Sequence, residues 1–163
     1  MPAPTLEFLY DSFGPMVLRR ARAMLCDEQA AWDATHEVFL KVLSALPQFR
    51  QDSSPVTWLY RTTTNHCLNL LRERARRGED EMTEDCGDSH HPRHEERLTL
   101  IKVLNRVQPE LREIAVYYYL DQMSQDEIAS LTGLSRRTVG NRLVAFHEAA
   151  RLAAGSAAKA EVS

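Results

Sequence analysis

Residues 49–77 read FRQDSSPVTWLYRTTTNHCLNLLRERARR, and this pattern guides the interpretation of the rest of the chain. A polar segment leads to Pro55, which suits the first turn of a helix because an N–H group there would have no helical partner. After Pro55, apolar side chains recur at helical spacing on one face. The stretch ends in a cluster of arginines. The pattern predicts a long amphipathic helix that begins at Pro55 and ends near Arg77.

The two faces of this predicted helix differ in chemistry. The expected apolar stripe consists of Val56, Leu59, Tyr60, Thr63, Cys67, Leu70 and Leu71. The expected polar face consists of Trp58, Arg61, Asn65, Asn69, Arg72 and Arg76. An aromatic ring beside cationic donors is the combination that binds a single nucleic-acid strand. Exposed arginine and asparagine are also common on solvated helices, so periodicity alone favours neither interpretation.

The residues before this stretch also have helical patterns. Gly14 and Pro15 are expected to interrupt the chain between a short helix over residues 5–12 and a second helical segment over residues 15–25. Asp27 is expected to cap a further helix over residues 28–45. Its expected inward side chains are Trp32, Thr35, Phe39, Val42, Leu43 and Leu46.

Charge is strongly segregated, although the net charge of the 163-residue chain is only -3. Residues 61–77 contain five arginines and one glutamate, whereas residues 78–94 contain six acidic residues and one arginine. The second segment has almost no apolar residues, so burial cannot offset the entropy lost on ordering it. We expect residues 78–94 to be a flexible acidic linker.

After the linker, the run SQDEIASLTGLSRRTVGNRL at 124–143 has the features of a helix-turn-helix. Ser124 and Glu127 can form a capping box, and Gly133 permits a tight turn between two helices. The second helix would present polar side chains to a DNA major groove, namely Ser135, Arg136, Arg137, Thr138, Asn141 and Arg142. The alternative is an ordinary helical hairpin with a solvated basic face.

Other features limit the possible functions. Three scattered cysteines favour a reducing compartment, and no apolar run approaches the length of a membrane span, so we expect a cytoplasmic protein without membrane insertion. The spacing of Cys86, His90, His91 and His94 matches no standard metal site, so we expect no bound metal. No Gly-rich phosphate loop or nucleophile–base pattern is present. We therefore expect no catalysis, no cofactor and no small-molecule substrate.

Together these stretches resemble bacterial RNA polymerase sigma factors of the extracytoplasmic-function group. The resemblance rests on DATHEVFLKV at 33–42, SSPVTWLYRTTTN at 53–65 and the helix-turn-helix. It implies an all-α fold with two small helical domains. The expected domain boundaries are 1–77 for sigma region two, 78–94 for the linker, 95–155 for sigma region four and 156–163 for a disordered tail.

The resemblance also implies partners and roles for region two. Core RNA polymerase would be bound at its β′ clamp through Asp33, His36 and Glu37. A flipped base of the promoter's minus-ten element would be captured by Phe49, Ser53, Ser54 and Thr57. Trp58 would lie at the junction of duplex and bubble, while Arg61 and Asn65 would contact the opened strand.

Region four would bind the minus-thirty-five element as duplex DNA and would contact the β flap of the polymerase. The family commonly has basic residues where this chain has Gly140, Ala145 and His147, so its promoter preference is expected to differ. An anti-sigma factor is a further expected partner. Two alternative functions remain open: a sigma-like decoy that sequesters an anti-sigma factor, and a stand-alone helix-turn-helix regulator.

Overall fold

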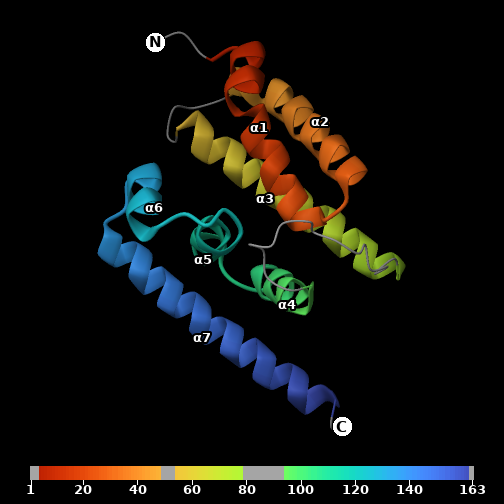
Figure 1. The fold of residues 1–163 in the computed structure, drawn as a ribbon, viewed down its shortest axis with the longest axis vertical. Helices are drawn as coiled ribbons and strands as arrows, with labels where there is room; N and C mark the ends of the chain where they lie inside the picture. Colours follow the sequence, from red (N-terminus) through yellow and green to blue (C-terminus); the bar gives the residue numbers. More distant parts are fainter. Residues whose placement is uncertain (1–3, 49–53, 79–93, 162–163) are drawn as a thin grey trace. The chain divides into compact units, whose positions relative to one another are not determined.

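The computed structural model describes the backbone of residues 4–48, 54–78 and 94–161 (Figure 1). Its regular structure in these ranges is helical throughout, which confirms the predicted all-α class. The chain divides into two compact units, Met1–His91 and Pro92–Ser163. The predicted linker lies mostly outside the described residues, and the predicted domain boundaries remain predictions.

The N-terminal unit is built from α1 (Leu6–Leu25), α2 (Glu28–Ala45) and α3 (Pro55–Arg77), each of which packs against the other two (Figure 1). A short 3₁₀ turn follows α2 at Leu46–Gln48. The core of the unit contains Leu9, Val17, Val38, Phe39, Val42 and Leu59. Burying these apolar side chains supplies the main force that holds the three helices together.

Each helix of this unit begins at a side-chain cap, which explains why its start was predictable. Thr5 accepts a hydrogen bond from the Phe8 N–H (3.2 Å), and Asp27 accepts one from the Ala30 N–H (2.9 Å). Such caps satisfy N–H groups that have no partner within the helix. The observed α2 and α3 match the predicted ranges.

The prediction of an interruption at Pro15 was wrong, because α1 is a single helix with Pro15 inside it. Proline removes the hydrogen bond that the carbonyl of Asp11 would otherwise accept. Asp11 and Pro15 are both exposed, so water can reach this part of the helix surface. Val17 and Leu18, which follow Pro15 in the same helix, are buried, and their packing stabilises a continuous helix.

The predicted inward face of α2 was partly wrong. Thr35, Phe39 and Val42 are buried as expected, whereas Trp32 is 39% exposed and Leu43 is 47% exposed. The buried stripe instead passes through small residues, with Ala31 fully buried. A close approach of α1 to α2 requires small side chains at the contact, so the larger Trp32 lies at its margin.

The C-terminal unit contains α4 (His94–Leu104), α5 (Pro109–Ala115), α6 (Gln125–Thr132) and the long α7 (Arg136–Glu161), drawn in dark blue in Figure 1. The helices α4, α5 and α6 all pack against α7. The core of this unit contains Ile101, Leu104, Ile114, Tyr117, Ile128, Val139, Leu143 and Phe146. A disordered tail was expected from residue 156, but α7 continues to Glu161. The alanine-rich composition favours this continuation because alanine has the highest helix propensity.

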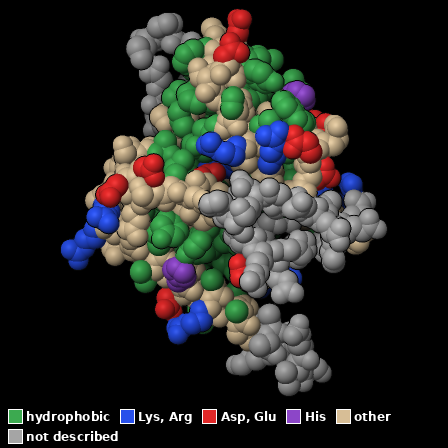
Figure 2. Space-filling view, viewed as in Figure 1, with side chains coloured by type: hydrophobic (Ala, Val, Ile, Leu, Met, Phe, Trp, Pro, Cys, Tyr) green, Lys and Arg blue, Asp and Glu red, His purple; other side chains and the backbone are tan. Residues whose placement is uncertain are grey.

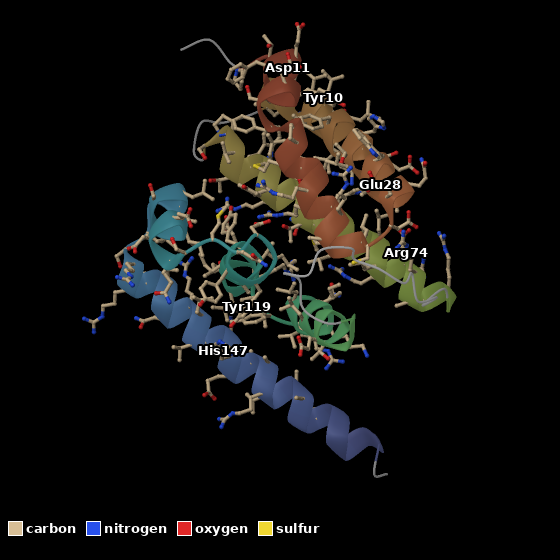
Figure 3. All side chains as sticks on the ribbon, in the orientation of Figure 1. Tyr10, Asp11, Glu28, Arg74, Tyr119 and His147 are labelled. Carbon is tan, nitrogen blue, oxygen red and sulfur yellow. The ribbon has the colours of Figure 1, made fainter. Side chains whose placement is uncertain are left out.

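A π-helical turn, η2 (Val116–Leu120), follows α5 directly. The Asp121 N–H donates to the carbonyl oxygen of Val116 (3.1 Å), five residues earlier. The helix that begins at Pro109 therefore changes its winding after Ala115. Within the unit, Tyr119 on this turn packs against Phe146 and His147 of α7 (Figure 3).

Candidate nucleic-acid interface

A buried arginine fixes the orientation of α3. Arg20 of α1 is only 2% exposed, and its Nη1 donates to the Tyr60 carbonyl (2.9 Å) and to Thr64 Oγ1 (3.0 Å). Its guanidinium also lies over the Tyr60 ring, 3.9 Å from the ring centre. A buried charge is tolerated only when such contacts compensate for its lost hydration. These contacts hold α3 in one rotational position against α1.

The proposed strand-binding residues Arg61 and Asn65 follow the two Arg20 contacts directly in sequence. Tyr60 and Thr64 face the core, and the next residue in each case is exposed. Arg61 and Asn65 are four residues apart, so they lie on one side of the helix. Arg20 therefore controls where this exposed pair is presented. Sequence reasoning missed Arg20, although its spacing from Val17 and Met24 places it on the buried stripe.

The sequence predicted that Trp58 lies on the exposed face of α3, but only part of its side chain is exposed. Its side chain is partly buried and packs against the core cluster of the N-terminal unit. Large aromatic side chains often combine a buried body with an accessible edge. The predicted role of Trp58 at the duplex junction would therefore use only the part of the ring that remains exposed.

The predicted base-capture residues have separate positions. Ser54 caps α3: its Oγ accepts from the Thr57 N–H (3.2 Å) and lies 2.9 Å from Thr57 Oγ1. Thr57 is 5% exposed, whereas Ser54 is exposed. Phe49 and Ser53 lie outside the described residues. Both Ser54 and Thr57 thus have a role in starting α3, whatever their contacts with DNA.

The basic end of α3 lies at its C-terminus. Arg72, Arg76 and Arg77 are exposed, and Gly78 ends the helix in the left-handed conformation (φ 70°). Cations at this end also interact favourably with the helix dipole. On the face shown in Figure 2, basic and acidic side chains of the described residues are interspersed.

The residues proposed for core polymerase binding share the outer face of α2. Asp33, His36 and Glu37 are all exposed, and Asp33 accepts a hydrogen bond from Gln29 Nε2 (3.0 Å). The ring of Trp32 lies beside that of His36, with 6.1 Å between the ring centres. Sequence reasoning missed Trp32 as a surface residue because it assigned this side chain to the core.

A pocket of about 360 Å³ adjoins this face. It is formed by α1 and α2, and its lining residues are Tyr10, Asp11, Gly14, Pro15, Leu18, Arg22, Trp32 and Thr35. Glu28 borders it, accepting from Trp32 Nε1 (3.1 Å) and pairing with Arg22 (Figure 3). The hydrogen bond from Arg22 lowers the pKa of the Glu28 carboxyl. Glu28 therefore stays ionised and holds Trp32 in place.

A second polar contact joins α2 to α3. Lys41 Nζ lies 2.7 Å from His66 Nδ1. Burial lowers the pKa of His66, and the positive charge of Lys41 lowers it further. The unprotonated ring nitrogen of a neutral imidazole can accept a hydrogen bond from the ammonium group of Lys41, whereas a protonated imidazole could not. This contact therefore depends on His66 remaining neutral.

The helix-turn-helix has the predicted geometry. Ser124 and Glu127 form a reciprocal capping box at the start of α6, and Gly133 has φ 73° at the turn. The hydrogen bond with the Ser124 backbone lowers the pKa of Glu127. Ser135 then accepts a hydrogen bond from the Thr138 N–H (3.0 Å) at the start of α7. These local contacts explain why this motif was recognisable from the sequence.

The predicted duplex-reading residues share the first turns of α7. Arg136, Arg137 and Asn141 are exposed, as is the capping Ser135, while Thr138 and Arg142 are partly buried. Between them, Val139 is fully buried and anchors the helix to the unit core. The arrangement presents guanidinium and amide groups, which can hydrogen bond to base edges and phosphates.

The three positions that are expected to depart from the family pattern also lie on α7. Ala145 and His147 are exposed, whereas Gly140 is partly buried. His147 Nε2 hydrogen bonds with the Tyr119 hydroxyl (Figure 3). Burial raises the pKa of that tyrosine. His147 thus makes a contact within the unit.

The candidate metal cluster lies mostly outside the described residues, which include neither Cys86, His90 nor His91. Where the side chains are described, no group of three or more potential ligands could hold a metal ion. Cys67 is buried, and burial raises its thiol pKa to about 12. Cys26 is disulfide-bonded.

None of the described helices is both long enough and apolar enough to span a membrane.

The two units match family models in chain order. Residues 9–77 match Sigma-70 region 2, and residues 97–145 match Sigma-70, region 4.

Curated relatives and a solved structure are similar to this chain. The ECF RNA polymerase sigma-E factor of Escherichia coli K12 is 31% identical over 72% of this chain and 70% of that protein. The ECF RNA polymerase sigma factor SigE of Mycolicibacterium smegmatis is 28% identical over 86% of this chain, but the match spans only 58% of its length. A solved structure of the sigma factor RpoE with the anti-sigma factor NepR from Bartonella quintana has 17% identity and a TM-score of 0.49, covering 87% of this chain and 91% of that one. The chain belongs to the sigma-70 family of RNA polymerase sigma factors, in its extracytoplasmic-function group.

Proposed function

We propose that this protein is an alternative sigma factor that binds core RNA polymerase in the cytoplasm and directs promoter recognition and DNA melting. The observation that carries this proposal is the presence of both sigma regions, in order, on two helical units with exposed polar faces. Binding to core polymerase and separation of the DNA strands require only noncovalent contacts and no chemical reaction. The role therefore needs no catalytic residue, cofactor or small-molecule substrate.

Core polymerase would bind the outer face of α2. Asp33 and Glu37 supply charge and His36 supplies a ring nitrogen, all on one exposed surface. By family resemblance the partner is the β′ clamp, while the C-terminal unit contacts the β flap. The adjacent Trp32 supplies an aromatic side chain, a type that is enriched at protein interfaces.

Promoter melting would use α3 and the residues just before it. Arg61 and Asn65 are exposed in a fixed orientation, and the exposed edge of Trp58 lies on the same helix. By resemblance, Phe49, Ser53, Ser54 and Thr57 would form the pocket for a flipped minus-ten base. Removing a base from the stack costs a few kcal/mol, so stacking and cationic contacts must offset that cost.

Minus-thirty-five recognition would use the start of α7. Ser135, Arg136, Arg137, Thr138, Asn141 and Arg142 lie together there. Guanidinium groups bind phosphates and guanine, and the amide of asparagine can pair with adenine. An anti-sigma factor that covers these surfaces would hold the protein inactive.

Reconstitution with core polymerase on a promoter library tests the proposal. We expect the wild-type chain to bind core and to initiate transcription from a subset of promoters. The double substitution Arg61→Ala and Asn65→Ala should abolish open-complex formation, detected by permanganate reactivity of unpaired thymines, while core binding is retained. Failure to bind core, or to initiate anywhere in the library, would reject the sigma function.

The same assay separates the alternatives. A decoy would bind an anti-sigma factor but would not open DNA, and a stand-alone regulator would bind duplex DNA without core. Asp33→Ala with Glu37→Ala should weaken core binding specifically. Arg19→Ala is a suitable control because Arg19 is an exposed charged residue of α1 outside the proposed surfaces.

A further inference from the structure

Gln125, the first residue of α6, lies beside a position of α7 that has no side chain. A Cβ atom added to Gly140 would lie 3.4 Å from Gln125 Oε1. This is an ordinary contact distance, so the glutamine amide occupies the space just outside Gly140. Gly140 lies within α7 and outside the left-handed region, so the backbone there does not require glycine. The absence of a side chain at position 140 therefore affects the surface of α7 beside Gln125 rather than the path of the backbone.

A second contact places the start of α6 along the same row of α7. Asp126 Oδ1 lies 3.5 Å from Arg136 Nε. Arg136 precedes Gly140 by four residues, so the two positions are neighbours on one side of the helix. Gln125 and Asp126 thus both border the first turns of α7. The capping box of Ser124 and Glu127 fixes the start of α6, which limits how far Gln125 can move.

The amide of Gln125 is available to a ligand. Its side chain is partly exposed and makes no hydrogen bond within the part of the chain that the structure describes. A glutamine amide offers one donor and one acceptor side by side. This pair matches the N6 and N7 atoms of adenine in the major groove. Neighbouring Arg136, by contrast, already interacts with Asp126.

We propose that Gln125 is a specificity-determining residue of the helix-turn-helix, whose amide lies in the space beside Gly140 and reads an adenine. The reading surface then comprises the start of α7 and the first residue of α6. This inference rests on the proposed binding of duplex DNA by the helix-turn-helix. It adds a residue from another helix to the surface predicted from the sequence.

The test uses the full chain assembled with core polymerase and a promoter pool randomised across the minus-thirty-five segment. Bound DNA is sequenced for the wild type, Gln125→Ala and the control Gln108→Ala. Gln108 is an exposed glutamine of the same unit, and its side chain makes no capping bond. We expect Gln125→Ala to reduce the preference for adenine at one position about tenfold, as for the loss of one bidentate pair. Gln108→Ala should leave the preference unchanged.

Two further variants make the result specific. Gln125→Glu keeps the size of the side chain but replaces the donor with an acceptor, so the preferred base should change from adenine to cytosine. Gly140→Ala places a methyl group 3.4 Å from Gln125 Oε1, which fits without displacing the amide but restricts its movement, and should alter the preference at that same position. In a Gln125→Ala background, Gly140→Ala should have no further effect.

Asn141→Ala separates the two levels of the proposal. If Asn141→Ala changes the base preference but neither Gln125 variant does, the role of Gln125 is rejected and duplex reading by α7 stands. If no variant changes any preference, duplex reading by the helix-turn-helix is itself rejected. A change confined to the Gln125 and Gly140 position supports the inference.

Discussion

The helices α3 and α7 are both proposed to contact DNA, but they are held in their units by different chemistry. A buried charge orients α3, since Arg20 of α1 bonds to its backbone and side chains. Apolar packing holds α7, with Val139, Leu143 and Phe146 all buried. Directional hydrogen bonds fix a rotation, whereas apolar contacts mainly fix a distance. A helix that must hold an opened strand benefits from the first arrangement.

Removing the Arg20 guanidinium should produce the largest effect. Arg20→Met leaves the Tyr60 carbonyl and the Thr64 hydroxyl without this buried partner, so we expect a loss of about 3 kcal/mol in the free energy of unfolding. Urea denaturation measures it. The matched control is Arg19→Met, because Arg19 is exposed and should change stability by less than about 0.5 kcal/mol. Equal effects of the two substitutions would remove the contrast between α3 and α7.

An apolar truncation tests the other side of the comparison. Val139→Ala removes buried methyl groups near the start of α7, and we expect a loss of about 2 kcal/mol. Val144→Ala is the control, because Val144 is 63% exposed on the same helix. Thermal unfolding followed by circular dichroism distinguishes the two variants. A larger loss from Val144→Ala would contradict the assigned core of this unit.

The cap of α3 should have a smaller effect. Ser54→Ala removes the acceptor for the Thr57 N–H, at an expected cost of about 1 kcal/mol. Ser12→Ala, at an exposed position within α1, serves as the control and should not destabilise the unit. If Ser54→Ala impaired promoter opening without any loss of stability, Ser54 would act on DNA alone and its capping role would be negligible.

The smallest expected effect is a pH dependence from His66. Its pKa is lowered in the folded state, so the unfolded chain binds this proton first as the pH falls. The stability from neutral His66 is therefore complete above the ordinary histidine pKa and is lost as the pH falls through the lowered value. We expect His66→Gln to reduce the slope of unfolding free energy against pH below about 6.5. His36→Gln, at an exposed position, is the control; a slope that His66→Gln leaves unchanged would contradict this linkage.

Local chemistry explains which parts of the fold were predictable. The starts of α2, α3 and α6 follow from side chains that cap them within a few residues. The turn after α6 was predictable because Gly133 readily adopts the positive φ that the turn requires. Helical spacing also placed Arg61 and Asn65 correctly on the exposed face. These features depend on residues that are close together in the sequence, so they can be predicted from the sequence alone.

The errors arose where distant segments decide the outcome. Trp32 and Trp58 were assigned to opposite environments, yet each is partly covered and partly accessible, because the fit between helices sets their burial. Arg20 carries a charge that composition assigns to the surface, but its partners lie 40 and 44 residues away. The contact of Gln125 with the Gly140 position likewise requires two helices to be placed together.

The π-helical turn at Val116–Leu120 has a consequence for how this unit tolerates changes in length. A π turn accommodates one residue more than an α turn, so this segment contains a surplus residue relative to a regular helix. Each residue of an α-helix advances the chain by about 100° around the axis. Deleting one residue here would restore regular winding but would turn Tyr119 away from His147. The surplus residue therefore keeps an aromatic contact in register, and a single-residue deletion should be more damaging here than a substitution.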